Sequence, residues 1–193
     1  LATCVLGASA ILLGGSRQQK ESVLPPLVRG ELCLALALEE SPHHDPLGVM
    51  LEARRAGAGY VLNGSKQFVL DGHSAGSLIV VARSRGDRGD RDGISLFLVN
   101  AGTAGIARRR TLMMDSRNAA RIDFNDVRVA ADALIGAEGE GYPILEQVLD
   151  RGRAALAAEM LGGIRATFER TIDYLKQREQ FGALIGSFQA LQH

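Results

Sequence analysis

The side chains best suited to binding chemistry lie near the carboxyl end of the chain, at residues 178–189. The planar guanidinium of Arg178 can bind two phosphate oxygens at once. Phe181 can stack on a planar base, and Gln189 can hydrogen-bond it. These groups lie at a predicted tight turn between two helix-like stretches, where a dinucleotide could be bound. The alternative is an ordinary helix end, where an arginine suits the negative pole of the helix and Gly182 suits the stop.

The balanced charge of the chain argues against partners that are attracted by a large net charge. The chain has 22 basic and 22 acidic side chains, so nothing favours nucleic acid or an anionic membrane surface, and an acidic ligand must be held locally. A length of 193 residues and a hydrophobic share of 46% fit one large or two small packed domains. Cys4 and Cys33 lack metal or redox spacing, which predicts reduced packing residues in a cytoplasmic protein.

The amino-terminal segment predicts two helices. The apolar run at residues 1–13 is too short to span a bilayer and has no basic leader, so we expect a buried helix that stops at Gly14 and Gly15. A short second helix should end at Pro25 and Pro26. The chain starts with Leu1 and stops within a helix-like stretch, so we expect an internal piece of a longer polypeptide.

The middle of the chain predicts antiparallel strands that close into a small barrel, because short apolar runs alternate with turns. Asn63-Gly64 indicates a type I′ hairpin turn between two of these strands. The charged stretch at residues 83–92 is typical of a solvated hairpin loop. The candidate strands are residues 32–38, 49–53, 60–62, 67–70, 78–82, 94–99, 106–112 and 121–127.

Residues 143–176 predict a helix with a buried apolar face. Gly162-Gly163 inside it costs about 1 kcal/mol per glycine relative to alanine, so either the helix breaks there or another backbone approaches closely. The expected fold is therefore α+β in three parts. Residues 1–30 end an amino-terminal helical domain, residues 31–136 form an antiparallel β-barrel middle domain, and residues 137–193 begin a carboxy-terminal helical bundle.

Four segments, taken in order, resemble the acyl-CoA dehydrogenase family. They are YVLNGSK at 60–66, IDFNDVRV at 122–129, LIGAEGEG at 134–141 and the stretch at 165–193 that contains Arg-Glu-Gln-Phe-Gly. The resemblance covers nearly the whole chain. It implies FAD as cofactor, an acyl-CoA thioester as substrate, a carboxylate base that removes the α-proton, and hydride transfer to the flavin N5 atom. It also favours close packing of a neighbouring helix at Gly162-Gly163.

The resemblance places the first flavin contacts after the first strand of the middle domain. Ala37 and Leu38 fall where the family hydrogen-bonds the flavin ring, and a leucine in place of the usual threonine leaves only its backbone N–H to serve. His44 replaces a serine that meets the pyrophosphate, and could donate an N–H instead. Residues 43–45 could equally be a simple exposed turn. They are a poor metal site, because adjacent histidines on one short loop seldom converge.

Further contacts follow from the same resemblance. Phe68, Val69 and Leu70 fall where an aromatic ring lies flat against the isoalloxazine, but Leu70 has lost the hydroxyl found two positions on from that ring. An ordinary core strand is the alternative for these residues. At the other end of the cofactor, the implied contacts are Arg178, Gln180, Phe181 and Gln189.

The substrate side is only partly contained in the chain. The resemblance implies that Asp150 and Arg153 lie near the acyl-CoA. Gly152 occupies an alternative position of the catalytic base, and a glycine cannot abstract a proton. In most family members the base comes later, which here means beyond His193, so the catalytic residue is unknown.

Two functional hypotheses follow. In the first, the parent protein is an FAD-dependent acyl-CoA dehydrogenase of fatty acid β-oxidation, located in the cytoplasm, oligomeric, and passing electrons to an electron-transfer flavoprotein. In the second, it is a non-catalytic partner subunit that completes the FAD site of a heteromer; the texture of the chain is most similar to the small subunit of pimeloyl-CoA-type dehydrogenases. A flavin monooxygenase is a third interpretation. The chain alone should be inactive and bind FAD weakly, because exposed apolar faces remain.

Overall fold

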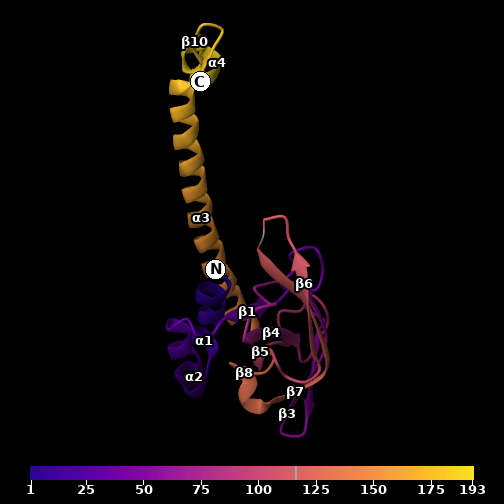
Figure 1. Ribbon diagram of the computed structural model, residues 1–193. Helices are drawn as coiled ribbons and strands as arrows, with labels where there is room; N and C mark the ends of the chain where they lie inside the picture. The colour runs from indigo at the N-terminus through magenta and orange to yellow at the C-terminus, as the bar shows by residue number, and fades with distance from the viewer. Residues whose placement is uncertain (116) are drawn as a thin grey trace. The chain divides into compact units, whose positions relative to one another are not determined.

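The computed structural model describes residues 1–115 and 117–193 (Figure 1). The chain forms two compact units, Leu1–Gly152 (unit 1) and Arg153–His193 (unit 2). The division falls inside one long helix, so it differs in kind from the domain boundaries expected near residues 30 and 136, which stay predictions.

Unit 1 begins with three short helical segments. They are a π-helix η1 (Ala2–Gly7), α1 (Ala8–Gly14) and α2 (Arg17–Val28). As predicted, α1 stops at the glycine pair. Ser16 caps α2 in a capping box with Gln19, which satisfies backbone donors at the helix start. The predicted stop at Pro25 and Pro26 is wrong: α2 continues to Val28, because prolines near a helix end still offer carbonyls, and these accept closing bonds from the backbone N–H groups of residues 29 and 31.

The sheet of unit 1 contains eight strands. They are β1 (Leu34–Ala37), β2 (Glu52–Ala56), β3 (Gly59–Leu70), β4 (Ser77–Arg83), β5 (Ile94–Asn100), β6 (Ile106–Leu112), β7 (Asn118–Ala130) and β8 (Leu134–Ile135). A 3-10 turn, η2 (Ala131–Ala133), leads into β8. The strand order is β6-β7-β3-β2-β4-β5-β8, and β1 pairs in parallel with β4.

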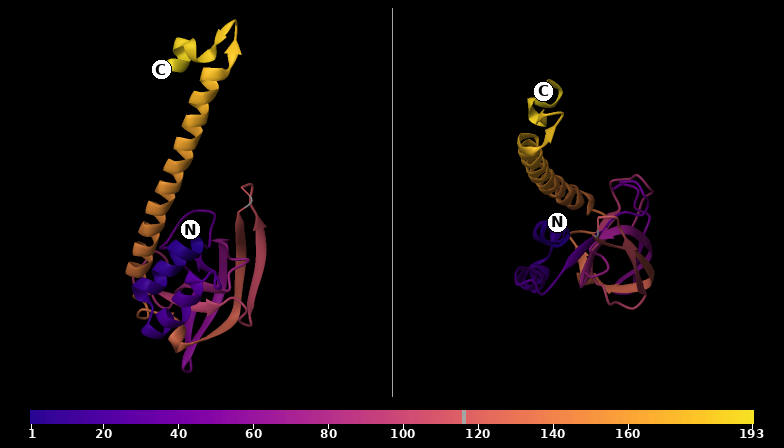
Figure 2. Two further views of the ribbon diagram at one scale, coloured as in Figure 1. Left: turned by 60° about the vertical axis from the view of Figure 1, so that its left-hand side comes forward. Right: turned by 45° about the horizontal axis from the view of Figure 1, so that its top comes forward.

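The predicted antiparallel β-barrel is wrong in two respects. The sheet curls around a core (Figure 2), but among the described residues β6 and β8 are left as its two ends and it does not close. It is also mixed, since β1 runs parallel to β4. Edge strand β6 carries three consecutive arginines at 108–110, and all three are exposed. Charged residues on an edge oppose further strand pairing, which a list of apolar runs does not reveal.

The predicted Asn63-Gly64 hairpin turn is also wrong. Strand β3 runs straight through both residues, and the two-residue turn lies earlier, at Gly57-Ala58, where Gly57 has φ +60°. Asn63 instead faces a bulge in β7: Asp126 has φ +49°, its N–H donates to Asn63 Oδ1 at 2.8 Å, and Asn63 Nδ2 donates to Asp126 Oδ1 at 3.1 Å. The same two residue types suit a tight turn and a bulge, so local sequence did not distinguish them.

Two cores lie on the two faces of the central strands. Along β4, Leu78, Val80 and Ala82 belong to the core inside the curled sheet, whereas Ile79 and Val81 belong to the core beneath the helices. Strands covered on both faces appear in sequence as continuous apolar runs, which explains why they were predicted well. The helices that cover the second core contribute Ala10, Ile11, Val23, Leu145 and Val148.

The long helix α3 (Tyr142–Gln177) is not broken at Gly162-Gly163. An added Cβ at either glycine would meet nothing within 4 Å in the described parts of the chain, so the close approach expected there stays a prediction. In unit 2 the helix exposes Met160, Leu161 and Phe168. These side chains form an apolar face that no described residue covers.

Unit 2 ends in a small hairpin rather than in the predicted turn between two helices. Strands β9 (Glu179–Gln180) and β10 (Ala183–Leu184) pair around Phe181 and Gly182, which have φ of +53° and +74°. A 3-10 turn, η3 (Ile185–Ser187), and the short helix α4 (Gln189–Gln192) follow. Figure 1 shows this hairpin at the end of α3.

Two further expectations concern single features. Cys4 and Cys33 are unbonded to each other but exposed, so the prediction that they are packing residues is wrong. Within the described residues, no helix combines the length and apolarity that a membrane crossing requires.

Candidate functional site

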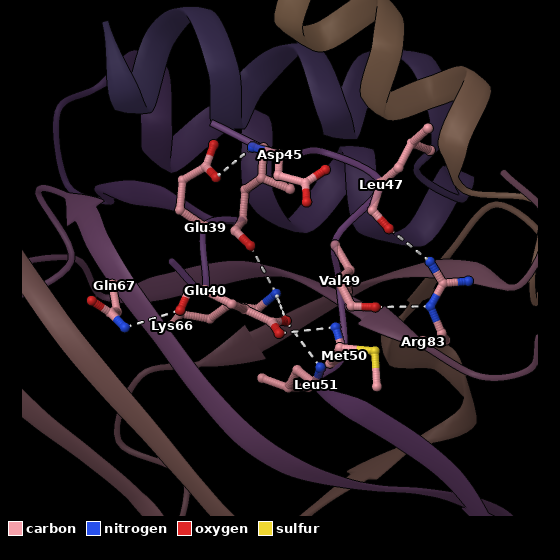
Figure 3. Close-up of polar contacts among 11 residues, drawn as sticks. Glu39, Glu40, Asp45, Leu47, Val49, Met50, Leu51, Lys66, Gln67 and Arg83 are labelled. Carbon is pink, nitrogen blue, oxygen red and sulfur yellow. Dashed lines mark hydrogen bonds and ion pairs between the residues drawn. The ribbon is translucent and has the colours of Figure 1, made fainter. Parts of the chain in front are cut away.

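The structure brings together residues that the sequence placed at two separate flavin contacts. The segment after β1 lies against the second half of β3, where the N–H of Gln67 donates to the carbonyl of Glu39 at 2.7 Å. Lys66 Nζ donates to the carbonyl of Leu38 at 2.9 Å (Figure 3). Leu38 and Phe68 therefore belong to one surface, which we call the platform: residues 37–40 together with residues 66–70.

Phe68 is turned out of its strand by a bulge. Lys66 pairs with Ile122 and Val69 with Ala120, so β3 advances three residues where β7 advances two. Phe68 takes up the extra residue with φ +48°, a conformation that an aromatic residue rarely adopts. Its side chain is 46% exposed, while Val69 is buried. Phe68 is therefore not a core residue, and its exposed ring directly follows Gln67, whose N–H bonds to the Glu39 carbonyl.

The apolar residues of the platform can offer a ligand polar contacts only through their backbone. Ala37 and Val69 are buried in the core inside the sheet, and Leu38 is buried in the core beneath the helices. Leu70 is half-buried and lines a pocket of about 140 Å³ together with Asp71 and other residues. Any polar contact that this part of the platform makes with a ligand must therefore come from peptide groups.

His44 is held by a carboxylate. Its Nδ1 lies 2.6 Å from Glu39 Oε1, and the N–H of Asp45 donates to Glu39 Oε2 at 3.3 Å. This contact uses Nδ1, so a ligand contact of His44 would be made through Nε2.

A pocket of about 200 Å³ opens beside the platform. It contains three carboxylates, each of which has a basic partner: Glu39 contacts His44, Glu40 contacts Lys66, and Asp45 contacts Arg88 at 3.0 Å. The acidic character of the pocket is thereby offset. Its lining residues are Leu38, Glu39, Glu40, Ser41, Asp45, Gly48, Met50 and Arg88.

Sequence reasoning missed the buried Lys66. Its side chain has no exposed surface, and Nζ donates to Glu40 Oε1 at 2.7 Å as well as to the Leu38 carbonyl. Burial lowers the pKa of Lys66 to about 8, and the neighbouring Glu40 opposes part of that shift. A signal was present: along β3, Lys66 has the same even spacing as the inward-facing Tyr60 and Leu62.

Arg83 was predicted to begin a solvated loop, and this is wrong for that residue. Its guanidinium is buried and donates to the carbonyls of Val49 at 2.8 Å and Leu47 at 3.1 Å (Figure 3). It also donates to the carbonyls of Asp90 and Asp92, both at 3.2 Å. Arg83 therefore ties the segment after the platform to the hairpin loop that follows β4.

The alternative base position holds a buried glycine. A Cβ built on Gly152 of α3 would lie 2.7 Å from Leu6 Cδ2, so a side chain there requires the end of the Leu6 side chain to shift. Asp150 and Arg153 flank it on the helix, and both are exposed. The expectation that this position supplies no base depends on the residue type, since a glycine has no proton-accepting side chain, and the catalytic residue stays unknown.

The predicted nucleotide contacts of unit 2 are all exposed. Arg178 holds the hairpin through its backbone, whose carbonyl accepts from the N–H of Ile185 at 2.8 Å. Phe181 is 95% exposed, and its ring meets that of Phe188 edge-on at 6.5 Å between centroids. The remaining two predicted contacts are Gln180, whose amide donates to the carbonyl of Glu179, and Gln189 on α4.

Comparison with known proteins covers both units. Residues 37–127 match the family model described as the middle domain of acyl-CoA dehydrogenase, and residues 139–193 match the model of its C-terminal domain. The mitochondrial long-chain specific acyl-CoA dehydrogenase of Mus musculus is 36% identical over 184 residues, which are 93% of this chain and 43% of that protein.

Solved structures give the same result. The butyryl-CoA dehydrogenase of Megasphaera elsdenii superposes with a TM-score of 0.91 at 34% identity, over 99% of this chain and 51% of that one. A glutaryl-CoA dehydrogenase from Mycobacterium smegmatis, solved in complex with FADH2, has a TM-score of 0.90 at 28% identity, over 99% and 49%. The chain thus spans about half the length of the relatives it matches. On these matches and this fold, the chain belongs to the acyl-CoA dehydrogenase family.

Proposed function

We propose that the protein containing this chain binds FAD and dehydrogenates an acyl-CoA thioester between its α and β carbons. Family membership supports the reaction class, and one observation supports a flavin site here: the bulge in β3 exposes Phe68 next to Gln67, which bonds to the Glu39 carbonyl. An aromatic ring held in this way fits a planar flavin. Bound FAD would accept a hydride from the β carbon at its N5 atom.

The residues of unit 1 would then divide the binding of the flavin ring. Phe68 stacks against it, and the peptide groups of Ala37, Leu38 and Val69 supply the polar contacts, because the corresponding side chains are buried. Leu70 contributes an apolar contact. His44 adds a contact to the pyrophosphate through Nε2.

In unit 2, the proposed contacts are with the adenine half of the cofactor. Arg178 binds phosphate oxygens, Phe181 stacks on the base, and Gln180 and Gln189 donate or accept at its edge. Their exposure supports this assignment, since each side chain is available to a ligand.

The rest of the reaction needs residues that this chain does not supply. Asp150 and Arg153 are proposed to lie near the acyl-CoA. The base is expected beyond His193, since Gly152 has no side chain to accept a proton. An electron-transfer flavoprotein as acceptor, a role in β-oxidation, a homo- or hetero-oligomeric state and a cytoplasmic location are part of the same proposal.

A second candidate is the partner subunit, which completes the FAD site of a catalytic sister chain. The platform favours it in one respect: neither Leu38 nor Leu70 offers a side-chain donor to the flavin ring. The similarity to the small subunit of pimeloyl-CoA-type dehydrogenases belongs to this candidate.

The test is to purify the protein that carries this chain and to add a saturated acyl-CoA without oxygen. We expect bound flavin whose colour is bleached by the thioester, and a loss of flavin in Phe68→Ala. Leu112→Ala, which removes a side chain that is 83% exposed on β6, is the control and should retain flavin. A protein that gains flavin only with a co-expressed sister chain would favour the partner subunit. Equal flavin content in Phe68→Ala and the control would contradict the platform.

A further inference from the structure

The charged group of Lys66 lies beneath the platform with no exposed surface. It donates to two acceptors, the Leu38 carbonyl at 2.9 Å and Glu40 Oε1 at 2.7 Å. One of these is main chain of the platform itself. Lys66 therefore joins β3 to the segment after β1 from the inside.

Glu40 extends this connection to a third segment. Its two carboxylate oxygens accept from the N–H groups of Met50 and Leu51, both at 2.9 Å (Figure 3). Residues 40 and 51 enclose the whole loop that contains His44 and the pocket beside the platform. The single carboxylate thus fixes the start of that loop, its end and Lys66 together.

Gln67 completes the connection on the other side of the backbone. Its N–H donates to the Glu39 carbonyl at 2.7 Å, and its side-chain amide donates to the Glu40 carbonyl at 2.9 Å. The residue that follows is Phe68, at the bulge. The two residues before the ring therefore bond to the carbonyls of residues 38–40 at three consecutive positions, through one backbone N–H and two side chains.

A buried ion pair is a poor device for stability, because desolvation offsets much of the attraction and apolar residues of similar volume often serve as well. A directional bond to a carbonyl and two amides does something that apolar packing cannot, since it sets one geometry. The pair lies where the placement of Phe68 against residues 38–40 is decided.

We propose that Lys66 and Glu40 are positioning residues, which hold Phe68 and the backbone of residues 38–40 in one arrangement before any ligand arrives. The inference rests on the proposed function in one respect, that the ligand of this surface is FAD. The internal arrangement of the platform is independent of that ligand.

The main test uses the double variant Glu40→Gln/Lys66→Met, which removes both charges while keeping volume and one acceptor for the loop amides. Phe68→Trp serves as reporter, because the chain has no tryptophan of its own. In the apo chain we expect the fluorescence anisotropy of this introduced indole to fall when the double change is added, and the N–H groups of Met50 and Leu51 to exchange faster. A folded double variant with unchanged anisotropy and exchange would overturn the proposal.

A second measurement uses FAD with the native Phe68. We expect the double variant to bind FAD about tenfold more weakly than the unaltered protein, because the surface must be ordered on binding. Gln67→Ala, which removes only the side-chain bond to Glu40, should weaken binding about threefold by the same reasoning, and it keeps the proposal testable if the double variant does not fold. FAD affinity equal to that of the unaltered protein in both variants would overturn the proposal. If the unaltered protein binds no FAD, the proposed function fails, while the apo anisotropy still tests the positioning role.

Discussion

Phe68 in unit 1 and Phe181 in unit 2 are two phenylalanines in the same unusual state. Both have positive φ, +48° and +53°, and both expose their rings, by 46% and 95%. The causes differ. Phe68 is held by a bulge anchored on the buried Lys66, whereas Phe181 lies in a two-residue hairpin turn beside Gly182.

The difference shows two ways of presenting a ring to a ligand. In the platform, tertiary bonds from distant segments impose the strained backbone, and the ring is fixed with it. In the hairpin, the turn itself demands positive φ at both central residues, so local geometry is sufficient. Asp71 and Asp126 also have positive φ, so left-handed backbone by itself does not mark a flavin contact.

The largest expected effect comes from breaking the anchor of the platform. Lys66→Met leaves Glu40 partly buried without its cation, and loss of one member of a buried pair should lower the free energy of unfolding by about 3 kcal/mol. Urea denaturation measures this. Lys176→Met, which removes an exposed lysine from unit 2, should change the value by less than about 0.5 kcal/mol. Equal stability of the two variants would show that the platform is not anchored at Lys66.

The same anchor predicts a pH dependence. The pKa of Lys66 is lowered from 10.5 to about 8, so between these values the folded chain binds fewer protons than the unfolded chain. Its contribution to the free energy of unfolding should therefore rise with pH through this window, by at most about 1.4 kcal/mol per pH unit. Below pH 8 the residue is charged in both states, and its contribution no longer changes.

Denaturation at several pH values, compared with Lys66→Met, isolates this contribution. The rise should be absent from Lys66→Met and retained in Lys176→Met. A rise of the same size in all three proteins would assign it to other groups.

The hairpin is tested by the turn glycine. Gly182→Ala places a Cβ at φ +74° and should destabilise the hairpin by about 1 kcal/mol without affecting the platform. We expect amide hydrogen exchange of the Ile185 N–H, which bonds to the Arg178 carbonyl, to become faster. Exchange of the Leu51 N–H should stay unchanged. Altered exchange at Leu51 or no change at Ile185 would contradict a purely local turn.

The smallest expected effect comes from replacing each of the two phenylalanines by glycine. Phe68→Gly and Phe181→Gly both relieve the strain of a side chain at positive φ, and each ring that is lost is substantially exposed. Each substitution should therefore raise the free energy of unfolding by 0 to about 1 kcal/mol. Phe68→Gly should nevertheless lose bound flavin. Urea denaturation and flavin content measure the two effects separately. Destabilisation by more than about 1 kcal/mol at either position would show that the ring contributes to packing.

Much of unit 1 could be predicted from sequence, because its central strands are buried on both faces and appear as unbroken apolar runs. The glycine pair that ends α1 and the long helix were predicted for equally local reasons. Closure of the barrel could not be predicted in this way, since it depends on whether β6 and β8 meet, which is a property of distant strands.

The candidate site likewise has features that the sequence indicated and features that it did not. A family resemblance marked Leu38, His44 and Phe68 from their order in the chain. It did not indicate the bulge that exposes Phe68, nor that Glu39 holds His44.

The sequence, through its family resemblance, therefore indicated which groups could meet a flavin: an aromatic ring, an arginine and two carboxamides at matching positions. Only the tertiary structure decided how unit 1 presents its share, because the φ of Phe68 and the burial of Lys66 depend on pairing between segments far apart in the chain. An Asn-Gly pair shows the same limit. Its local preference fits a turn and a bulge equally, and the partner strand β7 selected the bulge.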